Sequence, residues 1–316
     1  MSALLQPKSI ADLASQHASE PNSKAQQRAR YFNTGNAFNV QLPAVPNAVF
    51  VDEALQALDG DAPSGFIACD ASSVMQCDYP ATSPLLLARY ARIRAGESLA
   101  CNFNASGVVH YVISGAGSTD AGGELVEWRP GDVFVTPGGV PLVHTAGDAA
   151  AVLWVVSNEP QLSFENLRAP AAGDAPTDVV HYPAQEIDRQ IELIYNVGRD
   201  EQIAGSALIF SSDKQQDSRN VLPTLTLAMN SLPAGATQRP HRHNSVAVSL
   251  VIRGEKCFSK IDGERKDWAP WATTITPPVS VHSHHNEGDE QAMFLIVQDG
   301  GLFYHARAMG FEFIDD

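Results

Sequence analysis

Residues 112–137 read VISGAGSTDAGGELVEWRPGDVFVTP, and residues 251–277 read VIRGEKCFSKIDGERKDWAPWATTITP. The opening four residues of the two stretches align at an offset of 139, and their Trp, Pro and Thr-Pro positions align at 140, after one inserted residue. Both stretches alternate short β-branched runs with Gly and Pro turns, which is typical of antiparallel strands. The repeat indicates that one β unit occurs twice in the chain.

Extended outward, the repeat covers residues 95–156 and 234–297. Its segments have the length of strands, so each copy is expected to form one antiparallel barrel. We therefore predict an all-β fold of two antiparallel jelly-roll barrels with a few flanking helices. The predicted parts are an arm and connecting segment over residues 1–80, a first barrel over 81–160, a linker over 161–220 and a second barrel over 221–316.

Helices are expected only outside the repeats. Three isoleucines that share one face predict a helix over residues 184–197, with Gly198 as its stop. In the arm, Ser9 and Asp12 have the spacing of a capping box, and Lys24 to Arg30 form a second, weaker helical stretch. The linker is thus predicted to be structured.

Charge and composition exclude several classes of function. The 316 residues include 21 basic and 36 acidic side chains, a net charge of −15 that argues against a nucleic-acid partner. The longest apolar run, residues 149–156, is far shorter than the roughly 20 residues that a membrane helix needs, and the amino terminus lacks a signal pattern. The four cysteines form no C-x-x-C pair. These features predict a cytoplasmic protein without a membrane partner.

The histidines of the second copy are spaced to bind a metal ion. His241 and His243 alternate on one segment, so on a strand both side chains point to the same side. His282 follows 39 residues after His243, from a later strand of the same barrel. Three convergent neutral imidazoles suit a divalent transition metal, and we predict these three as its ligands. His284 has the parity of His282 and is expected nearby without ligating.

The first copy is predicted to lack this site. At the repeat offsets, His241 aligns with Asn102, His243 with Asn104 and His282 with Leu142, none of which suits a transition metal. We therefore expect the first barrel to be structural. An octahedral ion held by three histidines alone would keep three positions open, which favours a chelating substrate and one small molecule such as O₂.

Two motifs carry a family resemblance: RPHRHNSVA over residues 239–247 and TPPVSVHSHHN over residues 276–286, both with degenerate counterparts upstream. They resemble the motifs of bicupins, and most closely those of gentisate, salicylate and 1-hydroxy-2-naphthoate 1,2-dioxygenases, which read H-R-H-T-Q-S-A and W-H-D-H. The resemblance implies a bicupin with Fe(II) on His241, His243 and His282. It also implies a homo-oligomer, dimer or tetramer, and a catalytic His284 that lies against the substrate.

The chain departs from that family in two places. The family usually keeps its metal in the first cupin, whereas here the second copy carries the histidines. The arginine with which the family grips the aromatic carboxylate would fall on Ser249. Arg239, on the strand parity of His241, and Gln298, on the last strand of the barrel, are the candidates that replace it in binding substrate. Possible aromatic pocket walls are Phe258, Trp268, Trp271 and Tyr304.

The leading hypothesis is an Fe(II)-dependent, extradiol-type 1,2-dioxygenase that cleaves the ring of a small salicylate- or gentisate-type acid with O₂. A second hypothesis places Mn, Ni or Zn on the same histidines, in an isomerase, cyclase or lyase that uses no O₂. The third is a bicupin that binds a small ligand without catalysis. Dependence on O₂, and exchange of ligands at the metal, distinguish the three.

Overall fold

The structure is a computed structural model that describes residues 8–171, 173–197 and 206–314. It divides into one unit of residues 1–43 and another of residues 44–316. In the first unit, the 3₁₀ turn Ile10–Asp12 has the predicted capping box: Ser9 Oγ accepts from the backbone of Ala11, and the Asp12 carboxylate accepts from the backbone of Ser9. The second helical stretch forms α1 (Lys24–Arg28).

The first barrel consists of two antiparallel sheets. Its six-stranded sheet has the order β11-β8-β5-β10-β3-β2, and its four-stranded sheet has the order β4-β9-β6-β7. These strands are β2 (Gly65–Ala68), β3 (Leu87–Ile93), β4 (Ser98–Cys101), β5 (Gly107–Ser114), β6 (Gly117–Ala121), β7 (Glu124–Trp128), β8 (Val133–Pro137), β9 (Leu142–Ala146), β10 (Ala151–Ser157) and β11 (Val180–Tyr182).

The second barrel has the same plan. Its six-stranded sheet has the order β1-β18-β15-β20-β13-β12, and its five-stranded sheet has the order β17-β16-β19-β14-β21. These strands are β1 (Val49–Phe50), β12 (Ser206–Phe210), β13 (Thr226–Leu232), β14 (His241–His243), β15 (Ala247–Arg253), β16 (Cys257–Ile261), β17 (Glu264–Asp267), β18 (Thr273–Thr276), β19 (His282–Asn286), β20 (Ala292–Gln298) and β21 (Phe311–Phe313).

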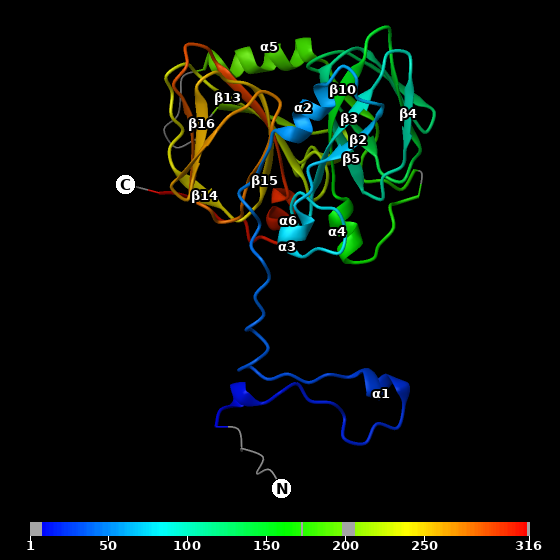
Figure 1. Cartoon of the computed structure of the whole chain (residues 1–316), viewed down its shortest axis with the longest axis vertical. Helices are drawn as coiled ribbons and strands as arrows, with labels where there is room; N and C mark the ends of the chain where they lie inside the picture. The colour runs from blue at the N-terminus through cyan, green and yellow to red at the C-terminus, as the bar shows by residue number, and fades with distance from the viewer. Residues whose placement is uncertain (1–7, 172, 198–205, 315–316) are drawn as a thin grey trace. The chain divides into compact units, whose positions relative to one another are not determined.

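The prediction of an all-β fold with two jelly-roll barrels is confirmed. Each barrel is a pair of facing sheets rather than one closed ladder of hydrogen bonds, and Figure 1 shows the two barrels side by side. Segments that flank the repeats add edge strands, since β1 pairs with β18 and β2 pairs with β3. The second barrel therefore includes a strand that lies more than 200 residues earlier in the sequence.

The six-stranded sheets are buried on both faces. On β10, Val152, Trp154 and Val156 join a core that both barrels share, whereas Leu153 and Val155 alternate with them into the interior of the first barrel. This alternation explains the almost continuous apolar runs in these strands. Across the shared core, the Trp154 indole donates a hydrogen bond of 2.9 Å to Thr273 Oγ1, which joins the two barrels.

Helices cover the ends of the barrels. The predicted linker helix forms α5 (Ala184–Tyr195), which ends two residues before the predicted boundary; Gly198 lies outside the described residues. Ile187 and Ile191 anchor α5 in the shared core, above the barrels in Figure 1. No described helix has the length and apolar character to cross a membrane. The others are α2 (Asp52–Leu58), α3 (Ser72–Met75), α4 (Glu159–Phe164), α6 (Gly300–His305) and the 3₁₀ turn Asp213–Gln215.

Candidate metal centre

Three histidines converge inside the second barrel. His241 and His243 are buried on β14, while Arg242 between them is exposed and forms an ion pair with Glu312. His282 on β19 pairs directly with His241. One ring nitrogen from each of the three histidines lies within 4.8 Å of the others, with all three side chains buried. The strand alternation therefore brings together the three residues that the sequence singled out.

Each of these three imidazoles has the same tautomer, because each Nδ1 faces a backbone carbonyl. A carbonyl oxygen only accepts, so Nδ1 carries the proton and Nε2 keeps its lone pair. Three lone pairs are thereby available at the point of convergence. The acceptors are Arg239 O at 2.8 Å from His241, Ser245 O at 2.9 Å from His243 and Ser280 O at 2.9 Å from His282.

Burial keeps the three imidazoles neutral. It lowers the pKa of His243 to about 4 and that of His282 to about 2, and it also lowers the pKa of His241. Within the described residues, the group contains no carboxylate or thiolate. A set of three neutral nitrogen donors fits a divalent first-row metal ion such as Fe(II), Mn(II), Ni(II) or Zn(II).

His284 has the opposite tautomer. Its Nδ1 lies 2.8 Å from Ser259 Oγ, and Ser259 Oγ in turn lies 2.9 Å from the indole nitrogen of Trp268. An indole only donates, so it occupies one acceptor site of the Ser259 oxygen, and because Ser259 is buried with no other side-chain partner among the described residues, its hydroxyl hydrogen is left to donate to Nδ1. The proton of His284 is then on Nε2. Burial lowers the pKa of His284 to about 3, so the ring is a neutral N–H donor.

The other predicted contacts are divided between the interior and the rim. The amide nitrogen of Gln298 lies 3.2 Å from Nε2 of His243, so this side chain reaches the metal position. The Arg239 side chain is exposed, with its guanidinium 4.4 Å from the centre of the Phe313 ring. Ser249, where the family would place an arginine, is buried. Arg92 is the one buried cation among the residues that the structure describes, and it binds carbonyl groups beside the first barrel.

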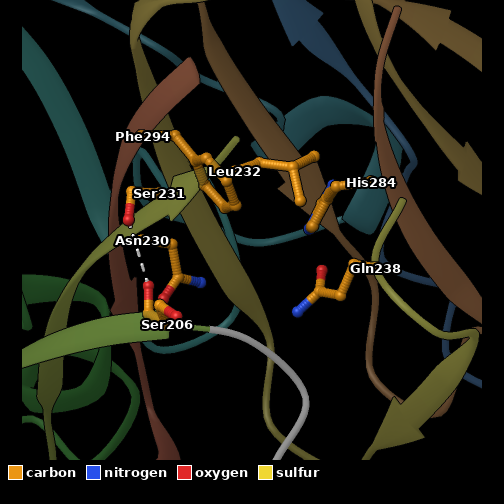
Figure 2. Close-up of a pocket in the computed structure, with 7 residues that line it drawn as sticks. All are labelled: Ser206, Asn230, Ser231, Leu232, Gln238, His284 and Phe294. Atoms are coloured by element: carbon orange, nitrogen blue, oxygen red, sulfur yellow. Dashed lines mark hydrogen bonds between the residues drawn. The ribbon is translucent and has the colours of Figure 1, made fainter. Parts of the chain in front are cut away.

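Two cavities border this region. An open hollow of about 210 Å³ reaches His243 and is lined also by Arg242, Asn244, Val279, Gly310, Phe311 and Glu312. A cavity of about 20 Å³ borders His284 on another side, between Gln238, Leu232 and Phe294 (Figure 2). The smaller one has room for little more than one water molecule. Of the four buried histidines, the larger hollow borders His243 and the smaller one borders His284.

Of the four candidate aromatic walls, the structure places one beside His284 and the others elsewhere. Trp268 contacts His284, with ring centres 5.8 Å apart. Phe258 instead stacks on His285, Tyr304 is exposed, and Trp271 lies near Tyr111 between the barrels. The aromatic residues beside His241 come from β21, which pairs with β14. They are Phe311 and Phe313, with ring centres 5.4 and 6.4 Å from His241.

The predicted correspondence with the first barrel is wrong by one residue. Cys101 pairs with Leu142 just as His241 pairs with His282, so Cys101 is the counterpart of His241, and Phe103 that of His243. Asn102 is exposed, and Asn104 caps the backbone of Ala169. The offset between the barrels is therefore 140 at β4 and β14, although it is 139 again at β5 and β15, where Val108 and Ala247 pair with the matched Thr136 and Thr276.

Sequence reasoning missed the partners of His284, although the repeat contains a signal for them. At an offset of 140, Ser259 aligns with Thr119, Trp268 with Trp128 and His284 with His144. The first barrel has the same network: the Trp128 indole lies 2.9 Å from Thr119 Oγ1, which lies 2.7 Å from His144 Nδ1. A hydroxyl at matched positions next to a matched Trp and His would have identified it.

Comparisons with known proteins locate the similarity in this barrel. A cupin domain model matches residues 229–298, which include all four histidines. A 5-aminosalicylate 1,2-dioxygenase of Comamonas is 36% identical over 95 residues, 30% of this chain and 25% of that enzyme. A gentisate 1,2-dioxygenase of Ralstonia is 27% identical over 127 residues, 40% of this chain and 31% of that enzyme. The matched part thus spans under a third of either relative.

The fold is similar over a much larger part of the chain. The salicylate 1,2-dioxygenase of Pseudoaminobacter salicylatoxidans, solved with gentisate, superposes with a TM-score of 0.72 at 14% identity. The superposition covers 89% of this chain and 88% of that one. The chain therefore resembles the gentisate and salicylate 1,2-dioxygenases as its motifs suggested, in sequence over part of its length and in fold over most of it.

Proposed function

We propose that the chain is an extradiol-type 1,2-dioxygenase that uses Fe(II) and O₂ to cleave a hydroxylated aromatic acid of the salicylate or gentisate type. The supporting observation is the arrangement of three Nε2 lone pairs beside one Nε2–H donor, within the stretch that the cupin domain model matches. His241, His243 and His282 would hold the ion. Both atoms of O₂ enter the product, and the bond between the hydroxyl-bearing and carboxyl-bearing ring carbons breaks.

The ion's contribution follows from its ligand number. Three histidines leave half of an octahedral shell for substrate oxygens and O₂, and this exchangeable half is the chemistry that the metal supplies. The protein fixes the donors in advance, because the carbonyls of Arg239, Ser245 and Ser280 orient the three rings. No rearrangement of these backbone contacts is needed when the ion binds.

Neighbouring side chains orient the substrate. His284 donates from Nε2 to a substrate oxygen, with its ring centre 5.9 Å from that of His282. The Gln298 amide contacts the lone pair of His243 when no metal is there, and it turns to a substrate oxygen when the ion takes that lone pair. The exposed Arg239, which lies over Phe313 on the strand beside His241, would attract the carboxylate, which the net charge of −15 would otherwise repel. Phe311 and Phe313 shield His241 from water.

The test is oxygen consumption by protein loaded separately with Fe(II), Mn(II), Ni(II) or Zn(II). The panel is salicylate, gentisate, 5-aminosalicylate, neutral catechol and benzoate, which lacks the hydroxyl needed for chelation. We expect uptake with Fe(II) and a hydroxy acid, entry of two ¹⁸O atoms from ¹⁸O₂ into the product, and no uptake with benzoate. The His243→Ala variant is the control for iron free in solution.

Other outcomes contradict the proposal in distinct ways. Turnover under strict anaerobiosis would indicate an isomerase, cyclase or lyase on the same three imidazoles. A closed metal site would neither change its spectrum on addition of salicylate nor bind nitric oxide, which would indicate a non-catalytic bicupin. Oxygen uptake with catechol but with none of the acids would show that the enzyme does not bind a substrate carboxylate. That result would be consistent with Ser249 at the position where the family has an arginine.

A further inference from the structure

We infer that Ser259 and Trp268 are positioning residues, which hold His284 as an Nε2–H donor beside the three converging histidines. The tautomer follows from the described contacts alone. The effect on turnover rests on the proposed function. None of the sequence motifs assigned a role to Ser259.

The hydrogen-bond directions leave one consistent arrangement. The Trp268 indole can only donate to Ser259 Oγ, at 2.9 Å. If His284 also donated from Nδ1, the serine hydroxyl hydrogen would need a third partner, and Ser259 is buried with only these two side-chain partners among the described residues. A buried hydroxyl hydrogen without an acceptor is disfavoured. Ser259 therefore donates to Nδ1.

His282, on the same strand as His284, shows how a different group behind the ring changes the tautomer. His282 and His284 lie two residues apart on β19 with side chains on the same face. Nδ1 of His282 faces a carbonyl oxygen, which leaves a lone pair at Nε2, whereas Nδ1 of His284 faces a hydroxyl, which leaves a hydrogen there. The type of group behind each ring thus separates a metal ligand from a hydrogen-bond donor.

The two matched histidines differ in their surroundings. Among the described residues Nε2 of His284 has no hydrogen-bond partner, and the ring borders the cavity of about 20 Å³ shown in Figure 2. In the first barrel, Nε2 of the matched His144 is buried, without a partner, in an interior filled by apolar side chains. The two networks are therefore alike, but the His284 ring borders a cavity whereas the His144 ring lies in a packed core.

The test uses ¹⁵N-histidine-labelled, metal-free protein and long-range ¹H–¹⁵N correlation spectra, which distinguish Nε2–H from Nδ1–H rings. Loss of signals in His284→Gln assigns His284. We expect an Nε2–H ring in the parent and in Ser259→Thr, since a threonine hydroxyl, that of Thr119, contacts Nδ1 of the matched His144 in the first barrel. In Ser259→Ala the tautomer should become mixed or reversed, and in Trp268→Phe it should become mixed. Thr119→Ala should alter His144 and leave His284 unchanged.

Turnover gives the second readout. With Fe(II) bound, Ser259→Ala should lower kcat about 10- to 100-fold, and Ser259→Thr should restore most of it. An Nδ1–H ring in the parent, or an unchanged Nε2–H ring in Ser259→Ala, would overturn the inference. Failure of the proposed function looks different: the tautomers behave as expected in the metal-free protein, while the parent consumes no oxygen with any acid.

Discussion

The two barrels share a frame and differ in what fills it. Both have a six-stranded sheet against the common core, a smaller facing sheet, and the same Trp-hydroxyl-His network. The first interior holds one continuous cluster of sixteen buried apolar residues. The second interior holds two clusters of three, with four buried histidines in the remaining space. A metal site thus occupies the place of a hydrophobic core.

This difference indicates that the shared core, rather than the interior, stabilises the six-stranded sheet of the second barrel. The six-stranded sheet of the second barrel is still packed on its other face, because residues such as Leu227, Val248 and Leu295 belong to the shared core. That burial allows the interior face of the sheet to carry polar side chains. Substitutions at matched interior positions should therefore have opposite consequences in the two barrels.

The largest effect is expected for His243→Ala. Removing one of three donors should reduce bound metal from about one ion per chain to background, because two imidazoles do not hold the ion against dilution. Stability of the metal-free protein should change little, since no ion is lost from it. Metal analysis after gel filtration, with urea unfolding of the metal-free form, measures both quantities. A full metal content in this variant would refute the placement of the site.

Phe103→Ala, at the matched position of the first barrel, should do the reverse. Phe103 packs in the apolar interior with its ring edge-on to Phe66, at 5.7 Å between ring centres. Truncation should lower the free energy of unfolding by about 3–4 kcal/mol. Metal content should stay at the parent level. Loss of metal from this variant, in protein that remains folded, would show that the first barrel also binds the ion.

The sequence predicted those features that depend on short-range alternation. His241 and His243 could be placed on one face because strand parity is local. The counterpart of His243 could not be found, because the offset between the barrels is 140 at β14 and 139 again at β15, and a slip by one residue exchanges Asn104 for Phe103. The pairing of β1 with β18 has no local signal at all.

Acid should destabilise the metal-free protein through its buried histidines. Burial lowers the pKa of His144 from 6.5 to about 4. The unfolded chain therefore binds more protons between these values, and stability present above pH 6.5 is lost as the pH falls. His144 alone should cost about 2 kcal/mol between pH 7 and pH 5. Urea unfolding at the two pH values measures it, and an unchanged pH dependence in His144→Leu would contradict this origin.

The smallest expected effect is a gain in stability from His110→Phe. His110 is fully buried in the first barrel and stacks on Phe134 with ring centres 4.3 Å apart, and among the described residues its ring nitrogens make no hydrogen bond of normal geometry, although the backbone of Val108 and Phe134 lies close to them. The phenyl ring of the variant keeps the stacking on Phe134 and removes the two buried ring nitrogens. We expect the free energy of unfolding at pH 7 to rise by about 1 kcal/mol, which thermal and urea unfolding can resolve.

The second barrel provides the matched control for this gain. His285 stacks on Phe258 in the same manner, at 4.5 Å between ring centres, but its ring nitrogens lie 3.3 Å from Thr237 Oγ1 and 2.9 Å from Ser283 Oγ. His285→Phe removes satisfied hydrogen bonds and should lower stability by about 1 kcal/mol. Opposite signs for the two variants would show that unsatisfied nitrogens, rather than stacking, make the difference. Equal signs would indicate that His110 has a partner, such as a buried water.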